Sequence, residues 1–150
     1  MGAIESDQPL VWSDRLLLGH SPMDATHREF VEVVGLLQAA ADHELADRLE
    51  SVLVHLERHF REEDTWMRDT NYPATDCHID EHAAVRASGR DVKQALADGH
   101  SEPCRRYADE LAKWFPGHAD YLDAPLAQWL SKKRFGGTPV VIKRGMAHPA

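Results

Sequence analysis

The sequence has little of what marks several large classes of protein. It contains only two cysteines in 150 residues, Cys77 and Cys104, which form neither a CxxC pair nor a disulfide framework. No apolar run approaches the roughly 20 residues that a membrane-spanning helix needs. Basic residues are also few, because 25 acids outnumber 17 lysines and arginines and give a net charge of −8. These absences argue against a disulfide-stapled secreted domain, a membrane protein, and a protein that binds nucleic acid or an anionic membrane.

The first 20 residues do not follow the pattern of a secretory signal peptide. Acids stand where such a peptide carries bases, and the apolar cluster from Leu16 to Leu18 is too short for its apolar region. The composition, 43% hydrophobic and 28% charged, is that of one globular domain. We therefore expect a cytoplasmic protein with reduced thiols and a single buried core.

Apolar residues recur at helical spacing between segments rich in proline, glycine and other turn residues. This pattern predicts four helices, at about 23–41, 42–68, 75–99 and 101–133. Because the joints between them are short, consecutive helices are expected to run antiparallel. We predict an all-α fold, an up-down-up-down four-helix bundle over residues 20–133, with an N-terminal arm (1–19) and a C-terminal tail (134–150).

Histidine is abundant, with ten in 150 residues, and it is the commonest ligand for transition metals in proteins. On the second predicted helix His59 and Glu63 are four residues apart, so they share one helical face, and His78 and His82 repeat that spacing on the third. Each predicted helix thus offers inward ligands at a similar depth of the bundle. The candidate metal ligands are His27, His59, Glu63, His78, His82, His118 and Asp123.

The number of candidate ligands suggests the metal. Five imidazoles supply five donor atoms, two bridging carboxylates supply four more, and one bridging oxo or hydroxo group adds two. Together they fill about eleven of the roughly twelve positions on two octahedral ions and leave one open. A dinuclear site rich in nitrogen and oxygen and without thiolate favours iron over zinc or copper. We therefore predict two iron ions with a bridging oxo or hydroxo group.

The order of these residues resembles the hemerythrin family. A first histidine is followed by HFxxE (His59 to Glu63), HxxxH (His78 to His82) and HxxxxD (His118 to Asp123), and Trp114 stands four residues before the last histidine. The likeness spans about residues 12–130. It implies that one iron is held by His78, His82 and His118, that the other is held by His27 and His59, and that Glu63 and Asp123 bridge them. It also implies reversible dioxygen binding at the open position beside His27 and His59, for storage, delivery or sensing.

Five side chains near the candidate ligands in sequence are expected to wall a dry ligand pocket. They are Phe30, Phe60, Trp114, Phe115 and Ala119. Members of the family often have a branched apolar residue directly after the last histidine, where this chain has Ala119.

The fourth helix departs from simple geometry, because residues five apart, such as His118 and Asp123, lie ~140° from each other on an ideal α-helix. Pro125 removes a backbone hydrogen bond and crowds the preceding turn. We therefore expect local unwinding that turns Asp123 inward.

The remaining histidines are interpreted as lying outside the ligand set. His55 is four residues before His59, but choosing it as a ligand would leave Glu63 two turns away, so we place it behind the ligands or on the surface. The others fall at predicted helix ends or in the arms: His20, His43, His100 and His148.

Other functions fit parts of the same pattern. A di-iron enzyme that consumes peroxide or nitric oxide would use the same seven ligands, and so would a sensing module that reports its ligand to a protein partner through residues 134–150. No acid or base is evident beside the open position, which favours a carrier over an enzyme.

The segment from His78 to His82 also fits the HxxEH signature of inverted zinc proteases, with Glu81 as the base. A metal-free bundle would bury two carboxylates and several imidazoles with only each other as partners, which is costly.

Overall fold

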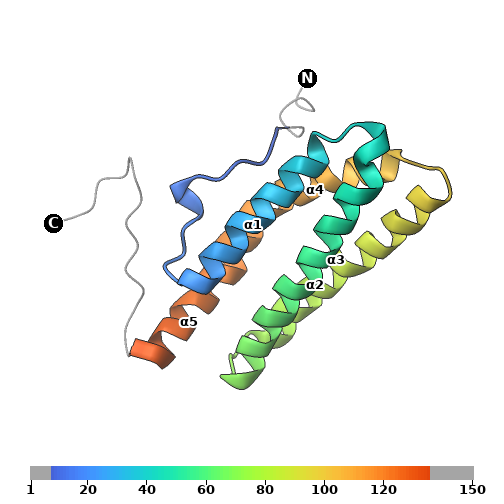
Figure 1. Ribbon diagram of the computed structural model, residues 1–150. Coiled ribbons are helices and arrows are strands. Elements are labelled where there is room, and N and C mark those ends of the chain that lie inside the picture. Colours follow the sequence, from blue (N-terminus) through green and yellow to red (C-terminus); the bar gives the residue numbers. More distant parts are fainter. Residues whose placement is uncertain (1–7, 136–150) are drawn as a thin grey trace.

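The computed structural model of the chain describes residues 8–135, and within that range it contains helices and no strand (Figure 1). The long helices are α1 (Ser21–Gln38), α2 (Leu45–Asp69), α3 (Thr75–Ala97), α4 (Glu102–His118) and α5 (Ala124–Phe135). A π-helical segment, Ala119–Asp123, joins α4 to α5 without a break, so the two form one continuous rod. The predicted all-α, four-helix fold is confirmed.

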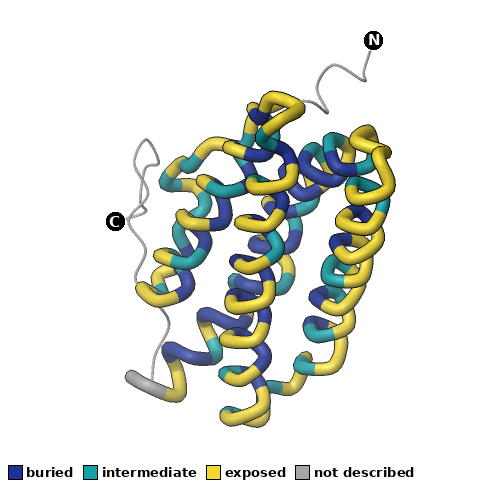
Figure 2. The backbone as a smooth tube through the Cα atoms, turned by 45° about the vertical axis from the view of Figure 1, so that its right-hand side comes forward, coloured by how far each residue is buried: buried dark blue, intermediate teal, exposed yellow. Residues whose placement is uncertain are grey.

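The helices α1 to α4 pack in a ring, each against two of the others. Helix α2 lies between α1 and α3, and α4 packs against both α3 and α1, which closes the ring (Figure 1). Figure 2 shows that the buried side of each helix turns inward and the exposed side turns to solvent. In α1 the buried residues recur every three or four positions, from Met23 to Leu37, as expected for one apolar face of an amphipathic helix.

The helix ends have local causes. His20, which the sequence interpretation left without a role, is the N-cap of α1, and its Nδ1 accepts a hydrogen bond of 3.2 Å from the Met23 N–H. At the other end of the bundle, Gly99 follows α3 with φ +92°, a value that favours glycine. The N–H groups of Gly99 and His100 bond to the carbonyls of Leu96 and Ala95, which completes a Schellman motif.

The described part of the N-terminal arm, residues 8–19, lies against the bundle. Gln38 Oε1 accepts a hydrogen bond of 2.8 Å from the Leu10 N–H, and the Asp24 carboxylate accepts from the N–H groups of Leu18 and Gly19. Leu10, Trp12 and Leu16 of the arm pack against the core, and Leu18 is buried in it. The predicted tail falls outside the described residues from position 136 onward.

The apolar core is divided into two clusters, and the candidate ligands lie between them. On α1, His27 stands between Met23 of one cluster and Phe30 of the other. On α2, Glu63 stands between Phe60 and Met67 in the same way. The bundle therefore holds a polar layer across its middle, closed at both ends by apolar packing. In the described part of the chain, no helix is both long enough and apolar enough to span a membrane.

Candidate metal centre

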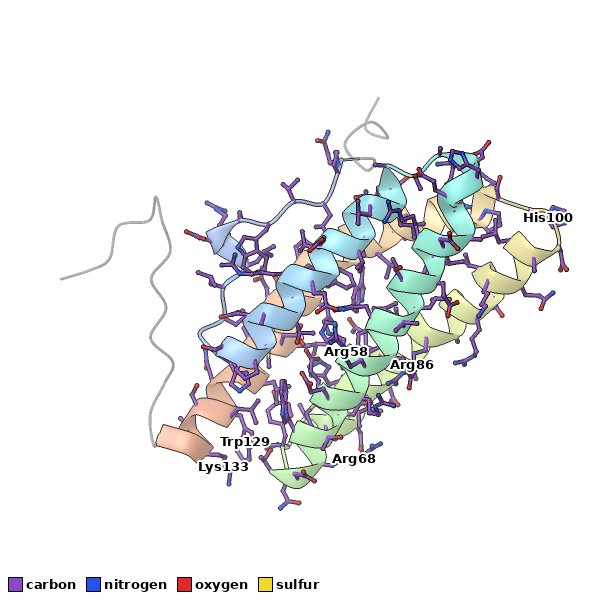
Figure 3. The ribbon with its side chains drawn as sticks, in the orientation of Figure 1. Arg58, Arg68, Arg86, His100, Trp129 and Lys133 are labelled. Carbon is purple, nitrogen blue, oxygen red and sulfur yellow. The ribbon has the colours of Figure 1, made fainter. Side chains whose placement is uncertain are left out.

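The structure brings the seven predicted ligands together from every long helix of the bundle except the α5 segment. None of the seven is more than 3% exposed: His27, His59, Glu63, His78, His82, His118 and Asp123. Their donor atoms form two groups of closely spaced ligands, one around three histidines and one around two. By contrast His100 lies in the turn between α3 and α4, at the far end of the bundle (Figure 3).

The two oxygens of Glu63 face different histidines. Glu63 Oε2 is 2.9 Å from His59 Nε2 and 3.5 Å from His27 Nε2. Glu63 Oε1 is 3.3 Å from His82 Nε2 and 3.6 Å from His78 Nε2. One carboxylate is therefore shared between the two histidine sets, with one oxygen for each.

Asp123 repeats this arrangement from the opposite side of the bundle. Its Oδ2 is 3.1 Å from His27 Nε2, and its Oδ1 is 3.0 Å from His78 Nε2 and 3.2 Å from His118 Nε2. The result is two adjacent donor sets. One has three imidazoles, the other has two, and each takes one oxygen from both carboxylates.

Most of these close contacts are not aligned as hydrogen bonds. Nine buried nitrogen and oxygen atoms of the seven residues have no hydrogen-bond partner within the described structure, and seven of the nine are Nε2 or carboxylate oxygen atoms at the centre of the cluster. Leaving that many buried polar atoms unsatisfied is costly. Metal ions between the two donor sets would satisfy these atoms, so the residues fit a dinuclear metal centre.

The buried carboxylates of the site also favour a bound cation. Burial lowers the pKa of His27, but the carboxylates of Asp123 and Glu63 outweigh that effect and raise it to about 10. The same carboxylates overcome burial at His78 and raise its pKa to about 9. Burial favours the neutral acids, yet the histidines around them hold the pKa of both carboxyls below its usual range. Two carboxylates in a dry layer thus require positive charge, from protons or from metal ions.

Asp123 reaches the centre because the helix changes its hydrogen-bond pattern. The Ala124 N–H bonds to the Ala119 carbonyl, five residues back, where an α-helix would use the carbonyl four residues back. The helix therefore departs from α geometry just before Pro125, as the sequence led us to expect.

Two carboxylates outside the ligand set hold the far nitrogens of the three-histidine set. Asp64 Oδ1 lies 2.8 Å from His82 Nδ1, and Glu81 Oε1 lies 2.8 Å from His118 Nδ1. Such contacts orient the ring and direct the lone pair of Nε2 toward a metal. Sequence reasoning missed this role for both residues, and the only hint was that each is adjacent to a candidate ligand in the chain.

Asp64 and Glu81 each contact a further side chain on the outer side of the bundle. Arg86, labelled in Figure 3, pairs with Asp64 at 3.5 Å, and the Trp114 Nε1–H donates to Glu81 at 2.9 Å. Glu81 is therefore turned toward His118 Nδ1 and Trp114 Nε1. That position does not suit the general base that the HxxEH interpretation required.

His55 lies directly behind His59, which agrees with its interpretation as a residue outside the ligand set. It is only 3% exposed, and its Nε2 is 3.2 Å from His59 Nδ1. Burial, together with the nearby His59, lowers the pKa of His55 to about 4. The ring is therefore neutral at neutral pH.

The predicted pocket walls divide between the two sides of the centre. Phe30 stacks on Phe115 with ring centroids 4.5 Å apart. The Phe30 ring lies 6.1 Å from the His59 ring, and the Phe115 ring lies 5.0 Å from the His27 ring. Ala119 is buried in the same apolar cluster. On the three-histidine side, Phe60 stacks on His82 and Trp114 stacks on His118. Phe60 also lies 5.3 Å from His59, so it reaches both sides, and Phe30 and Phe115 complete the apolar rings beside the two-histidine set.

The fold and the cluster define a helical-bundle protein with a candidate dinuclear metal centre. The family description "Hemerythrin HHE cation binding domain" matches residues 18–130. The chain belongs to the hemerythrin family. It is 34% identical to the bacteriohemerythrin of Ralstonia nicotianae over 122 residues, which cover 81% of this chain and 89% of that protein. It is 30% identical to the bacteriohemerythrin of Aquifex aeolicus over 119 residues, 75% of this chain and 91% of the other. No solved structure gave a significant match.

Proposed function

We propose that the seven clustered residues hold two iron ions and that the protein binds dioxygen reversibly, for storage, delivery or sensing in the cytoplasm. The observation that carries the proposal is the division of the oxygens of Glu63 and Asp123 between a set of three histidines and a set of two. Membership of a family whose description names a cation-binding domain, and the likeness to two bacteriohemerythrins, support it. A bridged pair of ferrous ions would supply the electrons and the open position that oxygen requires.

The inequality of the two histidine sets gives the small ligand its place. With both carboxylates and a bridging oxo or hydroxo group, three histidines complete six donors, whereas two histidines leave one position free. The free position would lie on the side of His27 and His59, where Phe30 and Phe115 pack. Rings this deeply buried exclude water, which protects a bound small ligand from protons and hydrolysis.

The residues around the centre favour a carrier over a catalyst. The acids that contact the histidines from outside, Asp64 and Glu81, lie at the Nδ1 atoms of His82 and His118, on the three-histidine side. Neither faces the side where we place the free position. The negative net charge further disfavours nucleic acid and anionic membranes as partners.

The test is an absorption measurement on protein loaded anaerobically with ferrous iron. Under the proposal, a new visible band appears when oxygen is admitted and disappears when oxygen is removed. His27→Ala should lose the band, whereas His100→Ala, which changes a histidine far from the cluster, should keep it. Sustained consumption of added peroxide or nitric oxide, without a reversible band, would instead identify an enzyme. A partner that binds only the oxygenated protein through residues 134–150 would identify a sensing module.

A further inference from the structure

A chain of three side chains leads from the two-histidine set to the protein surface. His59 Nδ1 is 3.2 Å from His55 Nε2, and His55 Nδ1 is 3.2 Å from Glu29 Oε1. Glu29 belongs to α1, and its side chain is 47% exposed. The chain therefore crosses from α2 to α1, and it connects a candidate ligand with a residue that solvent can reach.

The direction of these hydrogen bonds follows from what each group can donate. An ionised carboxylate only accepts, so His55 Nδ1 must carry the hydrogen that Glu29 receives. A neutral imidazole has one N–H, so His55 Nε2 has no hydrogen and can only accept. His59 Nδ1 must therefore carry the hydrogen that it donates to His55 Nε2. With a metal ion between His59 Nε2 and Glu63 Oε2, which lie 2.9 Å apart in this structure, Nε2 would then keep its lone pair for the metal.

Arg58 acts in the opposite direction. Its guanidinium pairs with Glu29 and also lies 3.4 Å from His55 Nδ1 (Figure 3). A guanidinium only donates. If Arg58 were the sole partner of His55 Nδ1, that nitrogen would accept, and His55 would carry its hydrogen on Nε2. His59 Nδ1 would then accept from His55, and a neutral His59 would carry its hydrogen on Nε2. An imidazole with hydrogen on Nε2 cannot bind a metal through that atom.

We propose that Glu29 is a positioning residue for the metal centre: acting through His55, it selects the tautomer of His59 whose Nε2 is free to bind metal, against the contrary influence of Arg58. This inference rests on the proposed iron site. It applies to the two-histidine side alone, because the three-histidine side has carboxylates in direct contact with its ligands. On the two-histidine side, His27 Nδ1 has no hydrogen-bond partner within the described structure. The contact of His59 Nδ1 with His55 Nε2 is therefore the outer hydrogen bond that orients a ring on that side.

The test is an anaerobic titration with ferrous iron of the wild type, Glu29→Ala, Arg58→Ala and the double variant. Glu29→Ala should bind one of its two irons about 10- to 100-fold more weakly, the range typical for loss of an outer partner of a metal-bound histidine. Adding Arg58→Ala should restore most of that affinity, because it removes the competing donor. Arg58→Ala alone should bind iron as the wild type does. The matched control is Glu50→Ala, which removes an exposed glutamate of α2 that pairs with Lys93.

A proton spectrum of the iron-loaded proteins adds a readout that general destabilisation would not change in this way. The iron-shifted, exchangeable resonance of the His59 Nδ1–H should be present in the wild type and the double variant and absent or displaced in Glu29→Ala. Wild-type iron binding by Glu29→Ala overturns the proposal, and so does a weakened Glu29→Ala that Arg58→Ala fails to rescue. A wild type that binds no iron would refute the proposed function itself, so the two failures are distinguishable.

Discussion

His118 and Asp123 face each other along one continuous helix, with His118 Nε2 3.2 Å from Asp123 Oδ1, although they are five residues apart. An ideal α-helix would separate them by ~140°. The intervening segment, Ala119–Asp123, is π-helical, and its i→i+5 hydrogen bonding places residues five apart about one turn from each other. The extra residue in this turn thus brings Asp123 to the same face as His118.

This geometry predicts opposite effects for two changes at Tyr121, the 81% exposed residue in the middle of the π-helical turn. Deleting Tyr121 leaves His118 and Asp123 four residues apart in a regular α-helix, still one turn from each other, so iron should be retained. Inserting one alanine after Tyr121 separates them by six residues and should release iron. Metal analysis of the two purified variants decides the matter, with Tyr121→Ala as the control. Equal iron content in the deletion and insertion variants would contradict this account of the turn.

A second pair of variants tests the choice of ligands on α2. Glu63 is 1% exposed and its two oxygens face both histidine sets, so Glu63→Ala should lose nearly all of its iron. His55 contacts only the outer nitrogen of His59, so His55→Ala should keep the iron of the three-histidine set, at least about one per chain. Circular dichroism should confirm that both variants are folded. The same iron content in both would show that the wrong residues of α2 were chosen.

Two pairs within the seven-residue cluster were predictable because they depend on local spacing. Residues four apart share a helical face wherever the helix is placed, which is why His59 with Glu63, and His78 with His82, could be paired from the sequence. The inward turn of Asp123 was also foreseeable, since Pro125 marks a disturbed turn. That these residues bind iron stays a prediction.

The contacts behind the ligands could not be predicted in this way. His82 and Asp64 are 18 residues apart, His118 and Glu81 are 37 apart, and each pair joins two different helices. No local pattern encodes the rotation of one helix against another that brings such residues within hydrogen-bond distance. For the same reason the partnership of His55 with Glu29 of α1 became visible only in the fold.

The ligand pocket that we predict beside the two-histidine set gives a third prediction, at Ala119. Ala119 is 1% exposed and belongs to the same apolar cluster as Phe30. A larger side chain should pack the pocket more tightly and keep water out. Ala119→Ile should therefore slow the decay of the oxygen-dependent absorption by roughly tenfold, equivalent to about 1.4 kcal/mol on the barrier.

The control for this change is Ala127→Ile, which enlarges a buried alanine of the other apolar cluster. It carries a comparable overpacking cost but should leave the decay rate unaltered. Decay rates of wild type and Ala119→Ile within a factor of about two would indicate that Phe30 already closes the pocket.

Iron loading should release protons, because metal binds neutral imidazole. In the metal-free protein the pKa of His27 is raised to about 10 and that of His78 to about 9, so both are protonated at pH 7.5. Loading should displace about one proton from each, and a bridging hydroxo group formed from water would release one more, so at least about two protons per chain are expected. A ferrous titration in weak buffer with a pH indicator measures this release. No release at pH 7.5 would contradict the prediction.

The same shifts set the sign of the pH dependence of stability. Raised histidine pKa values stabilise the metal-free fold fully below pH 6.5, and this contribution is lost as the pH rises through about 9 to 10. Iron affinity should change in the opposite sense and increase with pH across that range. Thermal unfolding of the metal-free protein and iron titrations, each at pH 6 and pH 9, check the two trends.

The central claim is that seven buried residues hold two irons in one chain, and metal content tests it most directly. Protein purified without added metal, and protein loaded with ferrous iron and then desalted, should be analysed for iron and zinc against protein concentration. The account predicts about two irons per chain in the loaded protein, with no comparable amount of zinc. A single zinc ion per chain, or no retained metal after iron loading, would contradict it.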